Sequence, residues 1–368
     1  MEKQHLTYFK IENFKRFDSF EMSNLGQFNL IVGDNNVGKT SVLEALTFDE
    51  NITRLAYNYW ITFWDRGLAQ SQEAEFTYKE IQQTRFWEAI FKKAGPIRIT
   101  ANNIDLRLEL RPHQQLYDPE KAAIKESVVT TIPDQWLKLS KIHNEGKFID
   151  WQLIAAYFEG SAIPKYNGFN LDSYVPFISA NLGYGSELIG IYYQFVNSNK
   201  NIRKEIESNL RLFIPKIEEI RPHKIGNSEV LGIILSDSNT LYPLTYFGDG
   251  TVKYFRLLLE VLITENRRLM VDEIGAGIHF THQKTYWKNI IQLFSKYNVQ
   301  LFATTHSLEC QQAFVEALSD EDMKQFQSEA RNIALLENKQ GEVKAFTYDF
   351  EQFEFSLSIG VNTRGGQL

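Results

Sequence analysis

A short glycine-containing stretch near the N-terminus carries the residue types that bind phosphate. Gly33 and Gly38 are separated by four residues and are followed at once by Lys39 and Thr40. Glycines at this spacing let backbone N–H groups point inward around phosphate oxygens, while a lysine neutralises charge and a threonine hydroxyl ligates Mg2+. The stretch therefore predicts a loop that binds the phosphates of a nucleotide and its magnesium ion. The predicted binding residues are Gly33, Asn35, Asn36, Val37, Gly38, Lys39, Thr40 and Ser41.

The segments on both sides of this loop supply the context that phosphate binding requires. Residues 28–32 are mostly apolar and end in β-branched side chains, which predicts a buried strand. After the loop, apolar residues recur at helical spacing within 42–46. A glycine turn without a ligand would explain the two glycines, but it would not explain the order strand, loop, helix.

Two adjacent carboxylates follow a second apolar strand, at 267–271. Asp272 and Glu273 stand at its carboxyl end, where ligands bind in open α/β sheets. We expect Asp272 to hold the magnesium ion, directly or through water, and Glu273 to act as general base toward the attacking water. The alternative is a strand that ends in ordinary surface acids. We favour the functional interpretation because the chain also contains a phosphate-binding loop.

Two further segments complete the candidate chemistry. The strand expected at 299–305 ends at His306, which can hydrogen-bond the γ-phosphate or the attacking water. Gly248, Asp249 and Gly250 precede a helix expected at 252–262, and such a helix start binds anions. A second anion site would be redundant within one nucleotide pocket, so we expect it to complete the pocket of a neighbouring subunit. An ordinary glycine-rich helix cap remains the alternative.

Composition places the chain among globular proteins and limits its class. With 368 residues, 43% of them hydrophobic, it can bury a large core in two or three structural units. The formal net charge of −7 argues against coating nucleic acid through bulk charge. Cys310 is the single cysteine, which excludes an intrachain disulfide. Without a signal-peptide pattern or about 18 consecutive apolar residues, the chain is expected to be cytoplasmic, with no membrane contact.

The order of patterns predicts a discontinuous domain. Residues 1–49 and 171–368 carry the strands and helices around the candidate site, and 50–170 form an insertion that we expect to be partly helical. This insertion is a possible region for partner binding or oligomerisation. Within it, alternating apolar residues predict a strand at 97–110. Elsewhere we expect helix at 186–222, strands at 230–235 and 241–244, and a closing hairpin from 333–336 and 343–348.

Taken together and in order, these segments resemble the ABC-type ATPases of the SMC, RecF and OLD group. The nearest resemblance is to compact prokaryotic AAA-family ATPases related to the ATPase halves of OLD nucleases. It covers 6–47 and 174–315, and it implies a P-loop NTPase fold of the ABC type, α/β, with a mixed sheet flanked by helices, a largely helical insertion, and ATP and Mg2+ as ligands. Further matching residues are Ile11, Asn13, Phe14, Lys15, Lys253, Arg256, Gly277, His279, Thr304, Thr305 and Ser307.

The resemblance also implies roles for the candidate segments. Residues 33–41 resemble Walker A, Asp272 and Glu273 resemble Walker B and the catalytic base, and His306 resembles the switch histidine. Residues 248–250 resemble the signature that acts in trans, although they lack its Ser-Gly-Gly core. Residues 275–279 resemble the D-loop, with Gly275-Ala276 in place of the Glu-Asn common in relatives. Asn181 is the nearest candidate for the glutamine that contacts magnesium.

Family resemblance implies a head-to-tail dimer, or a higher homo-oligomer, whose ATP occupancy controls a separately encoded effector. A Toprim or HNH nuclease in anti-phage defence or genome maintenance would fit. No Toprim nuclease is expected within the chain, because Asp320, Glu321 and Asp322 follow no apolar strand and indicate a solvated turn or helix start. One alternative is a nucleotide-gated scaffold or sensor with little turnover. Another is a RecF-like DNA-loading ATPase, so nucleic acid remains a possible partner despite the acidic balance.

Overall fold

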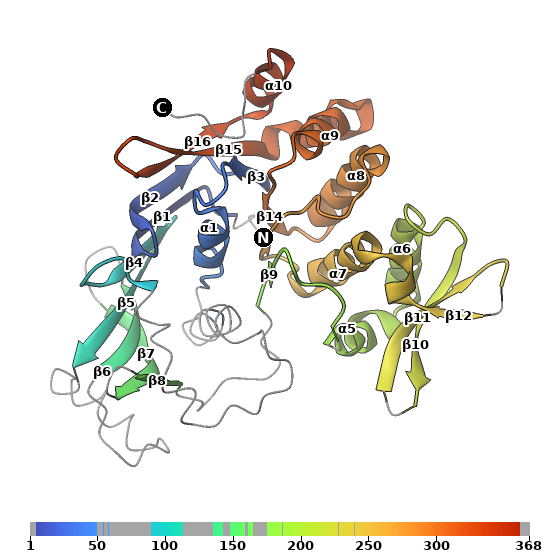
Figure 1. Ribbon diagram of the computed structural model, residues 1–368, viewed down its shortest axis with the longest axis horizontal. Helices are drawn as coiled ribbons and strands as arrows, with labels where there is room; N and C mark the ends of the chain where they lie inside the picture. Colours follow the sequence, from blue (N-terminus) through green and yellow to red (C-terminus); the bar gives the residue numbers. More distant parts are fainter. Residues whose placement is uncertain are drawn as a thin grey trace.

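A computed structural model provides the structure of the protein. It describes residues 5–49, 54, 58, 90–112, 135–142, 148–158, 161–164, 175–185, 187–226, 228–238 and 240–360. These residues form three β-sheets and the helices that cover them (Figure 1). Among the described helices, none is both long and apolar enough to pass through a lipid bilayer.

A six-stranded sheet lies at the centre of the molecule, in the order β16-β15-β3-β14-β13-β9. The strands β15, β3, β14, β13 and β9 run parallel, and β16 is antiparallel to β15. The predicted closing hairpin is therefore confirmed as β15 and β16. The bounds are β3 Phe28–Gly33, β9 Phe177–Ile178, β13 Arg268–Val271, β14 Gln300–Thr304, β15 Ala330–Glu337 and β16 Val343–Tyr348.

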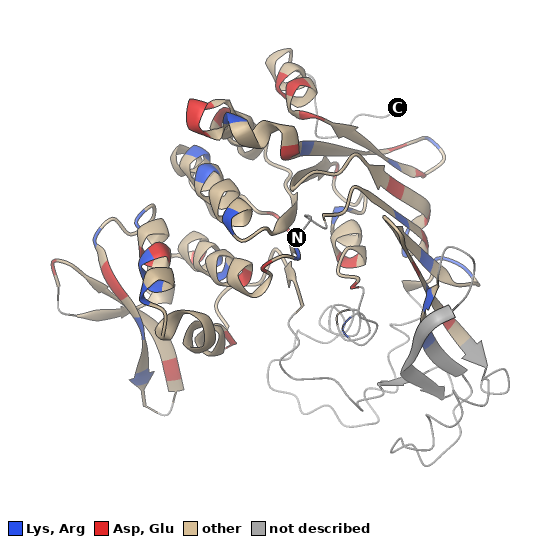
Figure 2. Ribbon diagram, turned by 180° about the vertical axis from the view of Figure 1, so that it is seen from behind, with Lys and Arg blue, Asp and Glu red and all other residues tan. Residues whose placement is uncertain are grey.

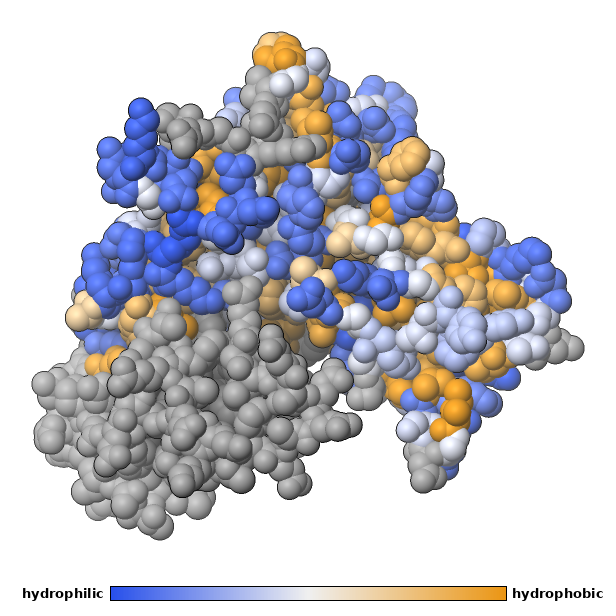
Figure 3. Space-filling model, in the orientation of Figure 1, coloured by the Kyte–Doolittle hydropathy of each residue, from blue (hydrophilic) through white to orange (hydrophobic). Residues whose placement is uncertain are grey.

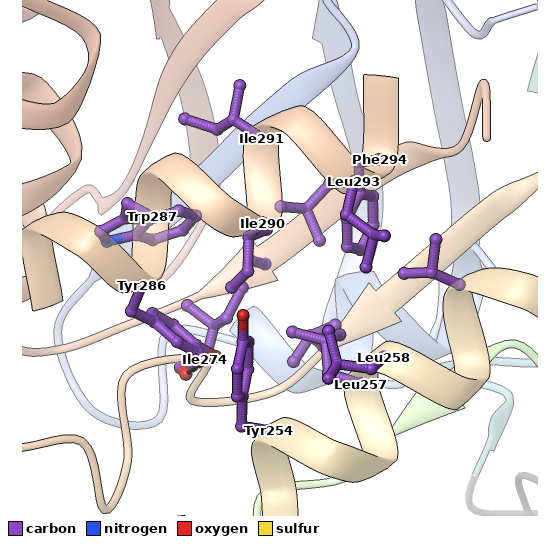
Figure 4. Close-up of a cluster of buried hydrophobic side chains, with 14 of the residues drawn as sticks. Tyr254, Leu257, Leu258, Ile274, Tyr286, Trp287, Ile290, Ile291, Leu293 and Phe294 are labelled. Atoms are coloured by element: carbon purple, nitrogen blue, oxygen red, sulfur yellow. Dashed lines mark hydrogen bonds between the residues drawn. The ribbon is translucent and has the colours of Figure 1, made fainter. Parts of the chain in front are cut away.

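Both faces of this sheet are buried, which explains why its strands are almost uniformly apolar in sequence. On one face, side chains of β3, β13 and β14 pack against α7, α8 and α9. Figure 4 shows the layer between α7 and α8, where Tyr254 and Leu257 lie opposite Tyr286 and Ile290. The helices on this face are α7 Asp249–Ile263, α8 Phe280–Lys296 and α9 Leu308–Ser319, and η5 Glu321–Glu329 and α10 Phe350–Ser358 follow along the chain.

On the opposite face, helix α1, Lys39–Ala45, lies between the central sheet and a second sheet (Figure 1). This second sheet is antiparallel and seven-stranded, in the order β2-β1-β4-β5-β6-β7-β8. Its first two strands come from the N-terminus, so the chain enters this sheet before it enters the central one. The bounds are β1 Tyr8–Phe14, β2 Phe17–Ser23, β4 Ile97–Ala101, β5 Ile104–Pro112, β6 Gln135–Ile142, β7 Phe148–Phe158 and β8 Ser161–Pro164.

The fold class expected from the resemblance is confirmed, but one part of it needs correction. The insertion at 50–170 was expected to be largely helical, whereas its described residues from 97 to 164 form mainly strands. The strand expected at 97–110 is present as β4 and β5, joined by a turn at Asn102. The strands β6 and β7 were missed because their apolar residues show no clear period. Their pairing with neighbouring strands, β6 with β5 and β7 with β6, stabilises them. Residues 59–89, which carry much of the expected helix, lie outside the described residues.

A third, three-stranded sheet lies at the far end of the helical side (Figure 1). The strands expected at 230–235 and 241–244 are present as β11 Ser228–Leu235 and β12 Leu241–Pro243. The helix expected across 186–222 ends earlier than predicted, because Pro215 follows Ile214 and cannot donate the backbone hydrogen bond that would continue it. The segment instead contains α5 Glu187–Ile191, η3 Tyr192–Asn197, α6 Lys200–Leu210 and then β10 Ile217–Ile225.

Charged and apolar residues are both visible on the surface. Acidic and basic residues occur side by side along the outer helices and along β10 and β11 (Figure 2). Helix α10 leaves Phe355 and Ile359 exposed, one helical turn apart, and Figure 3 shows apolar atoms over this helix at the top of the view. The acid triplet at 320–322 lies at the start of η5, as the sequence indicated.

Candidate active site

The loop between β3 and α1 has the backbone conformation that its glycines permit. Gly38 has a φ of 104°, in the region that favours glycine. A Cβ atom at Gly38 would lie 2.7 Å from the ring of Phe17, and one at Gly33 would lie 2.7 Å from the carbonyl oxygen of Leu335. Both glycines are therefore required by close packing against β2 and β15 as well as by the turn itself.

Lys39 lies folded over this loop. Its Nζ donates hydrogen bonds to the carbonyl oxygens of Gly33 at 2.8 Å and Asp34 at 3.0 Å, and the residue is only 8% exposed. Burial lowers the pKa of the Lys39 ammonium, and the nearby carboxylates of Glu273 and Asp272 act in the opposite direction. The ammonium thus lies among acceptors that phosphate oxygens could replace.

Asp272 lies opposite the loop, as the parallel order of β3, β14 and β13 requires. Its Oδ2 accepts a hydrogen bond from the Thr40 hydroxyl at 3.1 Å, and its Oδ1 accepts one from the Thr304 hydroxyl at 2.6 Å. A hydroxyl and a carboxylate are hard oxygen donors, the ligand type that Mg2+ takes when nucleotide phosphates supply further oxygens. These two side chains fit a magnesium–nucleotide complex, and the described residues contain no separate cluster of three metal-binding side chains.

Glu273 and His306 form a pair at the edge of the same site. The Oε2 of Glu273 lies 2.7 Å from Nδ1 of His306. The Glu273 side chain is 22% exposed and the His306 side chain 67% exposed, so the histidine lies on the open side. Glu273 has a φ of 53°, which is uncommon for a residue with a side chain.

A pocket of about 690 Å³ lies between the loop and the acid pair, and His306 is not among its described lining residues. Its described lining includes most of the predicted loop residues together with Asp272 and Glu273, so the structure brings together segments far apart in the chain. Within one chain, this pocket offers a nucleotide mainly polar groups. The described lining residues are Lys15, Arg16, Asn35, Asn36, Gly38, Lys39, Thr40, Ser41, Asp272 and Glu273.

Lys15 and Arg16 are site residues that the sequence reasoning did not assign. They form the two-residue turn between β1 and β2, where Phe14 pairs with Phe17. Arg16 donates to the carbonyl oxygen of Asn36 in the loop and pairs with Glu337 at 2.8 Å. The motif that starts at Ile11 marked this turn, but only the folded chain shows that it reaches the phosphate-binding loop.

Residues 248–250 do not line this pocket in the same chain, among the residues that the structure describes. They form the start of α7, where Gly248 has a φ of 85° and no side chain caps the helix. Gly250 packs directly on the backbone of Gly277, since a Cβ atom at Gly250 would lie 2.2 Å from the Gly277 carbonyl oxygen. The signature-like and D-loop-like segments therefore form one continuous surface.

Helix α7 also holds the loop that contains Asn181. Lys253 donates to the carbonyl oxygen of Ala180 at 2.7 Å, and Arg256 donates to that of Gly183 at 2.8 Å. The same loop follows β9, whose Ile178 carbonyl accepts from the backbone N–H of Asp272 at 2.8 Å. Asn181 itself is not among the described residues that line the pocket.

Gly275 packs closely against α9. A Cβ atom at this position would lie 2.8 Å from Sγ of Cys310, which is fully buried in α9. A longer side chain at this position would require the Cys310 side chain to shift.

We expect Gly275→Ala to lower the free energy of unfolding by about 1–3 kcal/mol, because overpacking forces neighbours to shift. Urea denaturation measures this change. In a Cys310→Ala background the same substitution should cost less, because the sulfur that it meets is gone. Equal costs in the two backgrounds would contradict the steric explanation.

The strand order, the loop and the acid pair define the class of protein, a P-loop nucleotide hydrolase. Comparison with known proteins narrows this class. Residues 5–155 match the model of the AAA ATPase domain family. The chain is 25% identical over 330 residues to a protein of Helicobacter pylori (strain ATCC 700392 / 26695) named "ATP/GTP phosphatase", covering 84% of this chain and 86% of that protein. Both similarities are to nucleotide hydrolases, and they support ATP hydrolysis by this chain.

Two solved structures are similar to this chain in fold, at low sequence identity. An SMC head bound to the C-terminal winged-helix domain of ScpA aligns with a TM-score of 0.46 at 11% identity, covering 95% of this chain and 99% of that one. The SMC head domain from Thermotoga maritima aligns with a TM-score of 0.40 at 12% identity, covering 94% and 100% of the two chains.

Proposed function

We propose that ATP is hydrolysed in the pocket between Lys39 and Glu273. The observation that carries this proposal is the chain of hydrogen bonds from Thr40 through Asp272 and Thr304 to the backbone of Glu273, at the mouth of the loop pocket. These hydrogen bonds connect Asp272, the proposed magnesium ligand, with Glu273, the proposed base, and this arrangement supports the proposal.

In the proposed reaction, a water oxygen bonds to the γ-phosphorus while the bond from phosphorus to the β–γ bridging oxygen breaks. Glu273 accepts the proton of that water, and ADP and phosphate are the products. Lys39 turns from the loop carbonyls toward the phosphates and offsets their charge. Thr40 and Asp272 would hold Mg2+, which supplies further charge neutralisation when bound. His306 keeps the Glu273 carboxylate on the open side, where the γ-phosphate would arrive.

A second copy of the chain is proposed to close the pocket head to tail. Residues 248–250 lie outside their own pocket, and the α7 N-terminus offers uncapped N–H groups that suit the phosphates of a partner's nucleotide. Tyr246, which is 79% exposed, precedes this segment, and Phe280, which is 69% exposed, follows the D-loop-like residues. Exposed aromatic side chains of this kind are typical anchors of protein interfaces.

We expect Tyr246→Glu to prevent ATP-induced pairing, because a charge would be buried at the interface without a partner. In a Glu273→Gln background, which holds ATP, analytical ultracentrifugation should show a pair without the change and a single chain with it. Tyr242→Glu, on nearby β12, is the matched control. If the Tyr246→Glu protein pairs as well as the Tyr242→Glu control, Tyr246 does not lie in the interface.

The biological role proposed from family analogy is control of a separately encoded effector, such as a Toprim or HNH nuclease, in anti-phage defence or genome maintenance. Activity of the neighbouring nuclease with wild-type protein and with Glu273→Gln protein tests this role. A nuclease indifferent to both proteins would remove the support for it.

A further inference from the structure

Thr304 connects the two carboxylate-bearing residues of the site. It is the last residue of β14 and is fully buried, with an exposed fraction of 0%. Its hydroxyl donates to Oδ1 of Asp272 at 2.6 Å and accepts from the backbone N–H of Glu273 at 2.9 Å. Its carbonyl oxygen accepts from the backbone N–H of Ile274 at 3.0 Å.

These contacts hold Glu273 in an unfavourable backbone conformation. A left-handed φ, here 53°, is unfavourable for a residue with a side chain and persists only where the surroundings hold it. The two peptide N–H groups on either side of the Glu273 α-carbon both donate to Thr304. One residue of the neighbouring strand therefore determines the direction in which the Glu273 side chain leaves the backbone.

The hydroxyl is suited to this task because it donates and accepts at the same time. Its donated hydrogen bond leaves Oδ2 of Asp272 facing Thr40, on the proposed metal side. Its accepted hydrogen bond turns Glu273 toward His306. A valine would have nearly the same shape but could do neither.

We infer that Thr304 is a positioning residue for ATP hydrolysis, which sets the orientation of the metal-side Asp272 and of the base-side Glu273 through one hydroxyl. This inference rests on the proposed function, since it assigns Thr304 a task in the same site. Thr304 does not line the pocket and does not touch substrate in the arrangement described. Its effect is exerted through its two neighbours.

The test compares Thr304→Val with Thr304→Ser and with a control, Thr264→Val. Thr264 is also fully buried and also donates its hydroxyl, but it does so to the Glu260 carbonyl at the far end of α7. For each protein, steady-state kinetics give kcat, the KM for ATP and the Mg2+ concentration at half-maximal rate. Thermal unfolding gives Tm.

We expect Thr304→Val to lower kcat about 10- to 100-fold and to raise the required Mg2+ concentration, as the loss of an outer hydrogen bond to a metal ligand does. The KM for ATP should change little, because the phosphate-binding loop is intact. Thr304→Ser should keep kcat within about threefold of wild type, because it keeps the hydroxyl. Thr264→Val should change Tm without changing the Mg2+ requirement.

If Thr304→Val does not fold, the pair Thr304→Ser and Thr304→Ala decides, because both lack the methyl group and they differ only in the hydroxyl. A Thr304→Val or Thr304→Ala protein with wild-type kcat and Mg2+ requirement would overturn the inference. Failure of the proposed function has a different signature: Glu273→Gln would hydrolyse ATP at the wild-type rate, whatever the Thr304 variants do.

Discussion

Glu273→Gln should lower kcat for ATP hydrolysis about 10²- to 10⁴-fold, the range for loss of a general base. Glutamine has almost the same shape and can remain beside His306, but it cannot accept the proton of the attacking water. The KM for ATP should stay near that of the wild type, because Glu273 lies opposite the phosphate-binding loop. Phosphate release measured under single-turnover conditions isolates the chemical step from product release.

The same protein should still bind ATP, and equilibrium binding of a fluorescent ATP analogue checks this. Glu321→Gln is the matched control, because Glu321 is an exposed carboxylate at the start of η5 whose partner is Lys324. A Glu273→Gln protein with wild-type kcat would contradict the proposed reaction. The nucleotide-gated scaffold would instead be supported if wild-type turnover were negligible and ATP binding alone set the assembly state.

Lys39→Met should lower kcat/KM by about 100-fold or more, because a buried ammonium opposite developing phosphate charge acts in a poorly solvated pocket. Methionine keeps the length of the side chain and removes its charge. Unlike Glu273→Gln, this change should weaken nucleotide binding as well as turnover, since the ammonium contacts the phosphates before and during reaction. Isothermal titration with ADP and with ATP separates the two losses.

Lys324→Met is the control for this substitution, because Lys324 is an exposed lysine of η5 whose loss removes one surface ion pair. Such pairs contribute about 0–1 kcal/mol to stability, so the control should unfold and hydrolyse ATP nearly as the wild type does. If Lys39→Met retained wild-type affinity for ATP, Lys39 would not contact the phosphates, and its proposed role would be wrong.

The sequence by itself determined the parts of the site whose chemistry is local. A glycine loop after one apolar strand, an acid pair after a second and a histidine after a third all belong to parallel strands. Because the carboxyl ends of such strands meet at one edge, Lys39, Asp272 and His306 could be expected together, and the structure brings their segments to one site.

Only the tertiary structure decided which other residues reach that site. The resemblance included Thr304 but gave it no task. Thr304 lies between Asp272 and Glu273 because β14 pairs with β13 in one register. Arg16 reaches the loop because β1 and β2 pair across a two-residue turn. The strand β6 pairs with β5, and β7 pairs in turn with β6, so both depend on partners that their own periodicity does not report. Such contacts depend on register between segments, which is a property of the whole fold.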